Sequence, residues 1–202
     1  MHTGAGYDAI VLAGGEGRRL GRVDKAAVEV GGRSLIDRVL RALDEAGRVV
    51  VVGPPRRMPA GVLGTSERPP GGGPAAGVAA GLALIEAPAV AVLACDLPFV
   101  TVETIRLLMA TLEDDAQRRC DGVQLVDEAG RQQPLAAVYR TAPLREAVAS
   151  LPHVAGSPMR ALVQPLTMLD VRAAPAQAWD CDTWADVDRA RTHANRHLVE
   201  EP

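Results

Sequence analysis

Short hydrophobic runs alternate along the chain with longer segments in which hydrophobic residues recur at helical spacing. The short runs are rich in valine and mostly continuous, a pattern typical of strands that are buried on both faces. This alternation predicts a three-layer α/β fold, similar to a Rossmann fold, in which helices cover both faces of a mostly parallel central sheet. The predicted strands span residues 9–12, 49–52, 62–65, 89–94, 122–126, 136–139 and 167–171.

Capping residues mark the ends of several predicted helices. Ser34 predicts an N-cap, with Asp37 as an incomplete capping box, and Gly47 predicts the end of the same helix. Pro74 predicts the first position of a second helix, and Thr101 predicts the N-cap of a third. The predicted helices span residues 34–46, 74–85, 102–112, 141–150, 159–163 and 184–198.

The length of 202 residues fits a single domain, which we expect to span residues 1–202. Proline and glycine predict loops at residues 54–59 and 67–74, and neither loop is long enough to be a linker between domains. The chain has two Trp, two Tyr and one Phe. We therefore expect a core of small aliphatic side chains.

Charge and cysteine content exclude several classes of protein. A net charge of -3 argues against a general nucleic-acid-binding protein, because affinity for phosphate backbones requires an excess of Lys and Arg. No apolar run reaches the roughly 18 residues of a membrane-spanning helix, and the first eight residues do not form a signal peptide. Three widely spaced cysteines indicate reduced thiols. We therefore expect a cytoplasmic protein that binds neither nucleic acid nor membrane.

A glycine-rich loop directly follows the first predicted strand. Gly14, Gly15 and Gly17 allow the backbone to turn sharply and to present its N–H groups to an anion, as in phosphate-binding loops. The loop is not of the Walker A type, because Lys25 is not followed by Ser or Thr. It is not the dinucleotide fingerprint either, because Leu20 replaces the third glycine. The residues thus predict a phosphate loop of another type.

Cationic side chains add to this loop. Arg18, Arg19 and Lys25 supply positive charge, and Lys25 is the only lysine of the chain. Because every other basic position is Arg, this lysine indicates a place where a compact ammonium is preferred to a planar guanidinium. The alternative is that one lysine survived by chance on a solvated loop.

Two aspartates follow or precede predicted elements at points where ligands commonly bind. Asp96 follows the strand predicted at 89–94, and its carboxylate suits Mg²⁺, but it could instead cap the turn that contains Pro98. Asp182 precedes the last predicted helix. Either Asp182 or Thr183 is the N-cap of that helix, or Asp182 is a second carboxylate that faces a metal or a nucleotide.

A pair of residues ahead of the strand predicted at 136–139 offers a further candidate site. Gln133 and Pro134 either meet a second substrate or end a β-turn.

Taken together and in this order, the motifs resemble those of the molybdenum cofactor guanylyltransferases, the MobA-type nucleotidyltransferases. The resemblance extends over nearly the whole chain. The Arg-Arg-x-Gly-x-x-Asp-Lys form of the loop is similar to the guanylyl branch of the wider nucleotidyltransferase superfamily. The motifs are Leu-Ala-Gly-Gly-x-Gly-Arg-Arg-Leu-Gly at 12–21, Asp24-Lys25-Ala26, Gly73-Pro74, Cys95-Asp96-x-Pro98, Gln133-Pro134-Leu135-Ala136 and Asp182-Thr183.

The resemblance implies a nucleotidyltransferase fold and Mg²⁺-dependent transfer of GMP from GTP to the terminal phosphate of molybdopterin, with release of pyrophosphate. GTP and molybdopterin would be the substrates, and enzymes that deliver molybdopterin or accept the product would be transient partners. No histidine lies near a motif, which suits a phosphate nucleophile that is already ionised at neutral pH. By this resemblance Leu12 to Gly14 would line the guanine nucleotide, Lys25 would bind its phosphates, and Asp96 would hold Mg²⁺ and the nucleotide. Together with the residue pattern, the candidate nucleotide-binding residues are Leu12, Ala13, Gly14, Gly15, Lys25, Gly53, Glu67 and Asp96, and the candidate catalytic residues are Lys25, Arg19 and Asp96. Asp182 is a candidate second metal ligand beside Asp96, and Gln133 and Pro134 are candidate acceptor-binding residues.

Two positions depart from the pattern of the guanylyltransferases. The Asn that follows their second strand is here Gly53, which offers no side chain, and the Asp before their Gly-Pro loop is here Glu67. These departures leave room for a molybdopterin cytidylyltransferase or for a nucleotide-sugar-forming enzyme of the same superfamily. A non-catalytic nucleotide-binding regulatory protein is a further alternative, which the presence of Lys25 and Asp96 disfavours.

Overall fold

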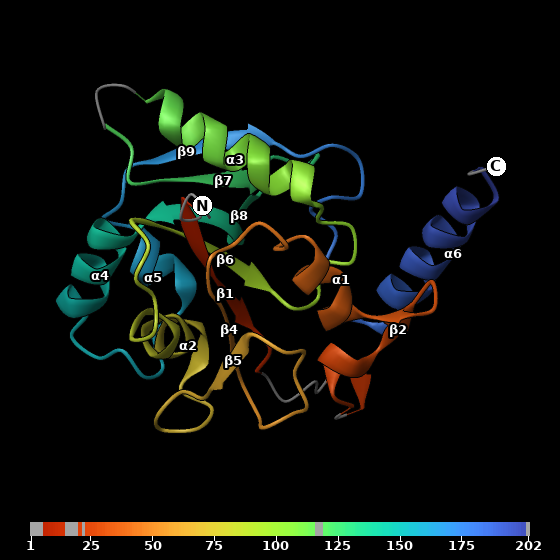
Figure 1. The fold of residues 1–202 in the computed structure, drawn as a ribbon, viewed down its shortest axis with the longest axis horizontal. Helices are drawn as coiled ribbons and strands as arrows, with labels where there is room; N and C mark the ends of the chain where they lie inside the picture. Colours follow the sequence, from red (N-terminus) through yellow and green to blue (C-terminus); the bar gives the residue numbers. More distant parts are fainter. Residues whose placement is uncertain (1–5, 15–19, 22, 116–118, 201–202) are drawn as a thin grey trace.

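The computed structural model describes residues 6–14, 20–21, 23–115 and 119–200. Its centre is a seven-stranded sheet in the order β5-β4-β1-β6-β8-β7-β9 (Figure 1). Within this sheet β8 runs antiparallel to both of its neighbours, and every other pairing is parallel. The strands are β1 (Tyr7–Leu12), β4 (Val49–Val52), β5 (Val62–Thr65), β6 (Ala89–Ala94), β7 (Gly122–Val126), β8 (Gln132–Arg140) and β9 (Met168–Arg172).

Helices cover both faces of this sheet, which confirms the predicted three-layer α/β fold with a mostly parallel sheet. Side chains of α1 and α3 pack on one face, and side chains of α2, α4 and α5 pack on the other. Aliphatic residues dominate both packed layers, as the composition predicts. The helices are α1 (Leu35–Arg41), α2 (Gly73–Leu82), α3 (Val102–Asp114), α4 (Thr141–Ser150), α5 (Met159–Val163) and α6 (Trp184–Glu200).

The two edge strands differ from the prediction that all strands are buried on both faces. In β5 and in β9 no residue is buried, and Leu63 and Leu169 are each 40% exposed. Both strands have a neighbour on one side only, so part of their side-chain surface stays in contact with water.

Helix α1 is shorter than predicted. Ser34 is its N-cap and accepts a hydrogen bond from the N–H of Asp37, as predicted, but the helix ends at Arg41. Short-range turn hydrogen bonds continue to Ala46, and the N–H of Gly47 donates to the carbonyl of Tyr7 at 2.9 Å. The glycine therefore joins the chain to β1 and does not form a left-handed helix end.

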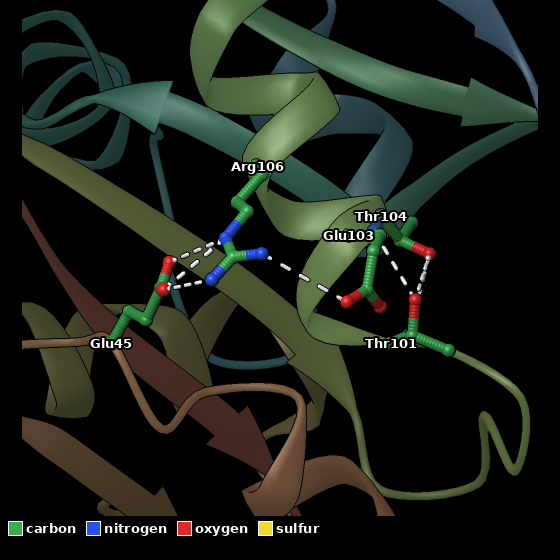
Figure 2. A network of polar contacts seen from close by, with 5 residues as sticks. All are labelled: Glu45, Thr101, Glu103, Thr104 and Arg106. Carbon is green, nitrogen blue, oxygen red and sulfur yellow. Dashed lines mark hydrogen bonds and ion pairs between the residues drawn. The ribbon is translucent and has the colours of Figure 1, made fainter.

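Figure 2 shows how polar contacts link the start of α3 to the turns after α1. Thr101 and Thr104 form a reciprocal capping box at the N-terminus of α3. Arg106 of the same helix forms an ion pair with Glu45 and lies 3.9 Å from a carboxylate oxygen of Glu103. The predicted cap at Thr101 is thus confirmed.

A small additional substructure beside the three main layers was not predicted. The 3-10 helix η2 (Lys25–Ala27) and a hairpin of β2 (Glu29–Val30) and β3 (Arg33–Ser34) follow the glycine loop. The turn contains Gly31 and Gly32, both with positive φ. This pair of glycines is a sequence signal for a two-residue hairpin.

Helix α6 packs beside this hairpin, away from the main sheet (Figure 1). Leu20, Val30 and Val187 are completely or almost completely buried between them. No helix in the described part of the chain is long and apolar enough to cross a membrane.

Tight packing between α2 and β1 gives a prediction. A Cβ atom at Gly81 would lie 2.8 to 2.9 Å from three side-chain carbons of Ile10, a fully buried residue. We expect Gly81→Ala to lower the free energy of unfolding by about 1–2 kcal/mol, because overpacking costs more than the better helix propensity of alanine returns. Urea unfolding measures this difference.

Gly64→Ala is the matched control. Nothing lies within 4 Å of a Cβ atom at this strand position. A loss of stability as large as that of Gly81→Ala would contradict the packing argument.

Candidate active site

The carboxyl ends of β4, β1 and β6 meet at one edge of the sheet. Leu12 pairs in register with Val52 on one side and with Ala94 on the other. Gly53 and Asp96 therefore follow the two strands that flank β1, and Gly14 follows β1 itself. This edge is where open α/β sheets bind ligands.

The ammonium of Lys25 connects three distant parts of the chain. Its Nζ lies 2.5 Å from Asp182 Oδ1 and forms an ion pair with Asp96 Oδ2. Lys25 is the first residue of η2, whose N-cap Asp24 accepts a hydrogen bond from the N–H of the buried Ala26. The helix thus presents the lysine to both carboxylates. The alternative interpretation, a lysine on a solvated loop, is wrong.

These contacts determine the charge of Lys25. Burial opposes the charged form, but attraction by Asp96 and hydrogen bonds to Asp182 and Asp96 outweigh it and raise the pKa of Lys25 above its usual range. The side chain is only 19% exposed. Lys25 therefore remains an ammonium throughout the physiological pH range.

The two aspartates do not serve as simple caps. Thr183 is the N-cap of α6, because its hydroxyl accepts from the N–H of Asp186 while the Asp186 carboxylate accepts from the N–H of Thr183. Asp96 Oδ2 pairs with Lys25, and its Oδ1 is buried with no hydrogen-bond partner among the described residues. The capping interpretation is therefore wrong for Asp182 and unsupported for Asp96.

Among the described residues, carboxylates outnumber cations around this ammonium. Partial burial raises the pKa of Asp180, and the charges of Asp182 and Asp96 raise it further. Three carboxylates thus lie in the electrostatic range of Lys25. Such an excess favours a further cation at this edge.

The residues present fit Mg²⁺ bound together with phosphates. The buried Asp96 Oδ1 has a lone pair directed at no donor of the described chain. In the described ranges no three His, Cys, Asp or Glu side chains gather as a complete metal cage. Magnesium usually takes one or two carboxylates and completes its shell with water and substrate phosphates, so Asp96 and Asp182 suffice.

A second group of predicted residues meets at the other side of the loop. A Cβ atom at Gly14 would lie 3.7 Å from Glu67 Oε1 and 3.9 Å from the Cα of Gly53. Glu67 Oε1 also accepts a hydrogen bond from the N–H of Gly71 at 3.1 Å. A carboxylate is thus held beside the glycine loop, where it can accept hydrogen bonds from a ligand.

Gly53 cannot be replaced without moving this loop. Its φ is +157°, and an added Cβ atom would lie 2.6 Å from the carbonyl oxygen of Ala13. Position 53 therefore carries glycine because its backbone lies in close contact with the backbone of Ala13 and Gly14.

Gln133 and Pro134 lie inside β8 and do not end a β-turn. The turn lies earlier, where the N–H of Gly130 donates to the carbonyl of Asp127. The carbonyl of Pro134 accepts a hydrogen bond from the hydroxyl of Tyr139 at 2.6 Å. β8 pairs antiparallel with β6, so the start of β8 lies beside the end of β6. Gln133 and Pro134 belong to the start of β8 and therefore lie toward the edge of the sheet that carries Asp96.

Two predicted site residues, Gly15 and Arg19, lie outside the described residues, as do Gly17 and Arg18. One contact of the site was not predicted. Arg56, from the loop after β4, donates to the carbonyl oxygen of Ala13 at 2.9 Å. The sequence marked this segment only as a proline-rich loop.

Comparison with known proteins identifies the family of this chain. The family model described as the MobA-like NTP transferase domain matches residues 9–171. A protein of Natronomonas pharaonis is 33% identical over 170 residues, which are 80% of each chain. A protein of Opitutus terrae is 35% identical over 196 residues, 90% of this chain and 93% of the relative. Both carry the name probable molybdenum cofactor guanylyltransferase.

A solved structure from Archaeoglobus fulgidus has the same fold. It is described as molybdopterin-guanine dinucleotide biosynthesis protein A and superposes with a TM-score of 0.71 at 22% identity, covering 94% of this chain and 99% of its own.

Removal of the central ammonium gives a second prediction. We expect Lys25→Met to lower the free energy of unfolding at pH 7 by about 1–3 kcal/mol, because Asp96 and Asp182 would face each other without a counter-charge. In the wild type this contribution is complete below about pH 10.5, the ordinary pKa of lysine, and is lost only as pH rises through the higher pKa of the folded state.

Urea unfolding of the variant and of the wild type at pH 7 provides the measurement. Arg57→Met removes an exposed cation and is the control. Equal stability of Lys25→Met and the wild type at pH 7 would contradict the role of the ion pair.

Proposed function

We propose a specific reaction for this chain, which belongs to the MobA-like NTP transferase family and is a nucleotidyltransferase. It transfers GMP from GTP to the terminal phosphate of molybdopterin and releases pyrophosphate. The observation that carries the proposal is the ammonium of Lys25 held between Asp96 and Asp182 beside a glycine loop.

Charge neutralisation is the main task of such a site. The reaction brings two polyanions together, and an oxygen of the acceptor phosphate attacks the α-phosphorus of GTP. The new bond joins this phosphorus to the acceptor oxygen, while the bond to the oxygen that bridges to the β-phosphorus breaks. Fixed positive charge and oriented N–H groups stabilise the charge that develops.

Lys25 supplies that charge to the triphosphate. In the free protein its partners are Asp96 and Asp182. Mg²⁺, when bound by these carboxylates, would neutralise the triphosphate and polarise its phosphoryl oxygens. Lys25 would contact phosphate oxygens of the triphosphate at the same edge of the sheet.

No protein base is required. The second pKa of a phosphate monoester is about 6, so the acceptor is largely ionised at neutral pH. Among the described histidines, His193 packs against Phe99 with ring centroids 4.7 Å apart, and His153 lies in the loop after α4. Neither comes from a segment that forms the candidate site.

The guanine base would lie on the other side of the loop. The backbone of Leu12, Ala13 and Gly14 would line it, beside Gly53, and Glu67 would accept hydrogen bonds from its N1–H and 2-amino groups. The proximity of Glu67 to Gly14 supports this assignment. Cytosine lacks this pair of neighbouring donors, so a carboxylate here favours GTP over CTP.

Molybdopterin would approach from β8, where Gln133 and Pro134 lie toward Asp96. The proposal includes a cytoplasmic location and transient contact with enzymes that deliver molybdopterin or take up the product. All three cysteines are free and buried, which fits a reducing compartment.

The reaction can be tested directly. Pyrophosphate release should require Mg²⁺, GTP and molybdopterin together, and EDTA should abolish it. Preference for CTP in parallel assays with CTP, ATP and UTP would indicate a cytidylyltransferase, and turnover with a sugar phosphate would indicate a nucleotide-sugar-forming enzyme. Absence of turnover with any pair would contradict the proposal.

Asp96→Asn tests the metal role. We expect kcat to fall about a hundredfold and the Mg²⁺ concentration at half-maximal rate to rise, because the amide keeps the shape but loses the charge. Asp188→Asn on α6, where the side chain is 71% exposed, is the control. Unchanged magnesium dependence of Asp96→Asn would count against a metal role for Asp96.

Glu67→Gln tests the choice of base. The amide keeps one acceptor and adds a donor, so we expect kcat/KM with GTP to fall about tenfold to a hundredfold while turnover with ATP changes little. Glu67→Asp should keep the preference for GTP. Glu113→Gln changes an exposed glutamate of α3 and serves as control. Equal losses with GTP and ATP would exclude a base contact by Glu67.

A further inference from the structure

We propose that Arg56 is a positioning residue that joins Ala13 to Asp24 and thereby sets the place of Lys25. This inference rests on the proposed nucleotide site, which it deepens. Arg56 lies in the loop between β4 and β5, outside the glycine motif and outside the residues predicted to bind ligand.

The guanidinium of Arg56 contacts both Ala13 and Asp24. Nη2 donates to the carbonyl oxygen of Ala13 at 2.9 Å, and Nη1 lies 3.3 Å from Asp24 Oδ1. Ala13 precedes the glycine loop and Asp24 ends it. A planar guanidinium with several fixed donors can hold two such acceptors at once, which a lysine cannot do in the same geometry.

The contact with Asp24 acts on Lys25. Asp24 Oδ1 accepts hydrogen bonds from Arg56 and from the N–H of Ala26. Lys25, the first residue of η2, lies between Asp24 and Ala26 in the chain. The direction of the Asp24 carboxylate therefore sets the start of the helix. Ala26 is 1% exposed, so the helix has little freedom to turn independently.

The loop after β4 needs such a side chain because Gly53 cannot supply one. A Cβ atom at Gly53 would lie 2.6 Å from the same Ala13 oxygen that Arg56 binds. Arg56 reaches this oxygen from three residues further along the chain. The backbone contact and the arginine contact thus fix Ala13 together.

Stability alone is a poor explanation for an arginine at this position. The side chain is only 13% exposed, and its Nε is buried without a hydrogen-bond partner in the described part of the chain. An unpaired buried donor costs free energy that an uncharged residue would avoid.

Binding of inorganic tripolyphosphate and of GTP, each with Mg²⁺, tests this role by calorimetry. We expect Arg56→Ala to weaken tripolyphosphate about tenfold to a hundredfold and GTP by at least the same factor, because Asp24 and Lys25 serve the phosphates that both ligands carry while Ala13 also lines the base. Arg56→Lys should recover part of the loss. The adjacent Arg57→Ala removes an exposed charge and should bind both ligands as the wild type does.

Asp24→Asn provides an independent arm. It should weaken binding in the same direction, and the double variant with Arg56→Lys should lose less than the sum of the two single losses, because both changes break one contact. This arm remains informative if Arg56→Ala does not fold. Thermal unfolding of each variant separates loss of the fold from loss of binding.

The possible outcomes separate the two proposals. A wild type that binds tripolyphosphate in an Arg56-dependent manner but does not transfer GMP to molybdopterin would overturn the proposed reaction and leave the role of Arg56 standing. Normal binding of both ligands by Arg56→Ala would overturn the role of Arg56 and leave the reaction standing. A loss confined to GTP would show a base contact and overturn positioning, and a wild type that binds neither ligand would overturn both.

Discussion

The candidate site depends on one partly buried ammonium that three remote segments share. Lys25 comes from the short helix after the glycine loop, Asp96 from the end of a central strand and Asp182 from the segment before the last helix. Without a cation between them, the two carboxylates would repel each other where protein limits access of water. The same charge that can serve a triphosphate therefore also holds the unliganded site together, which links folding of this edge to its chemistry.

Packing explains why this ammonium has a defined place. Leu20, Val30 and Val187 belong to a hydrophobic cluster that joins the segment after the glycine loop, the small hairpin and α6. Lys25 lies within the first of these segments, and Asp182 directly precedes α6. A cluster separate from the two sides of the main sheet thus positions two of the three charged groups, while the sheet positions Asp96. The geometry of the site therefore depends on how this cluster and the main sheet are held together.

The main sheet could be predicted closely from the sequence, because buried strands carry their own hydrophobic pattern. The strands Val49–Val52 and Ala89–Ala94 have the predicted bounds, and the place of Asp96 after the second strand followed from them. The partners of Lys25 could not be predicted, since they depend on contacts between residues far apart in sequence. Arg56 was missed for the same reason, because no local pattern tells an arginine that binds Ala13 from one in water.

The two departures from the guanylyltransferase pattern can be understood together. At position 53 the backbone lies so close to Ala13 that only glycine fits. Position 67 carries a side chain one methylene longer than aspartate, and a Cβ atom at Gly14 would lie 3.7 Å from its carboxylate and 3.9 Å from the Cα of Gly53. Both positions thus border Gly14. A polar group remains beside the glycine loop although the residue that provides it comes from a different strand end.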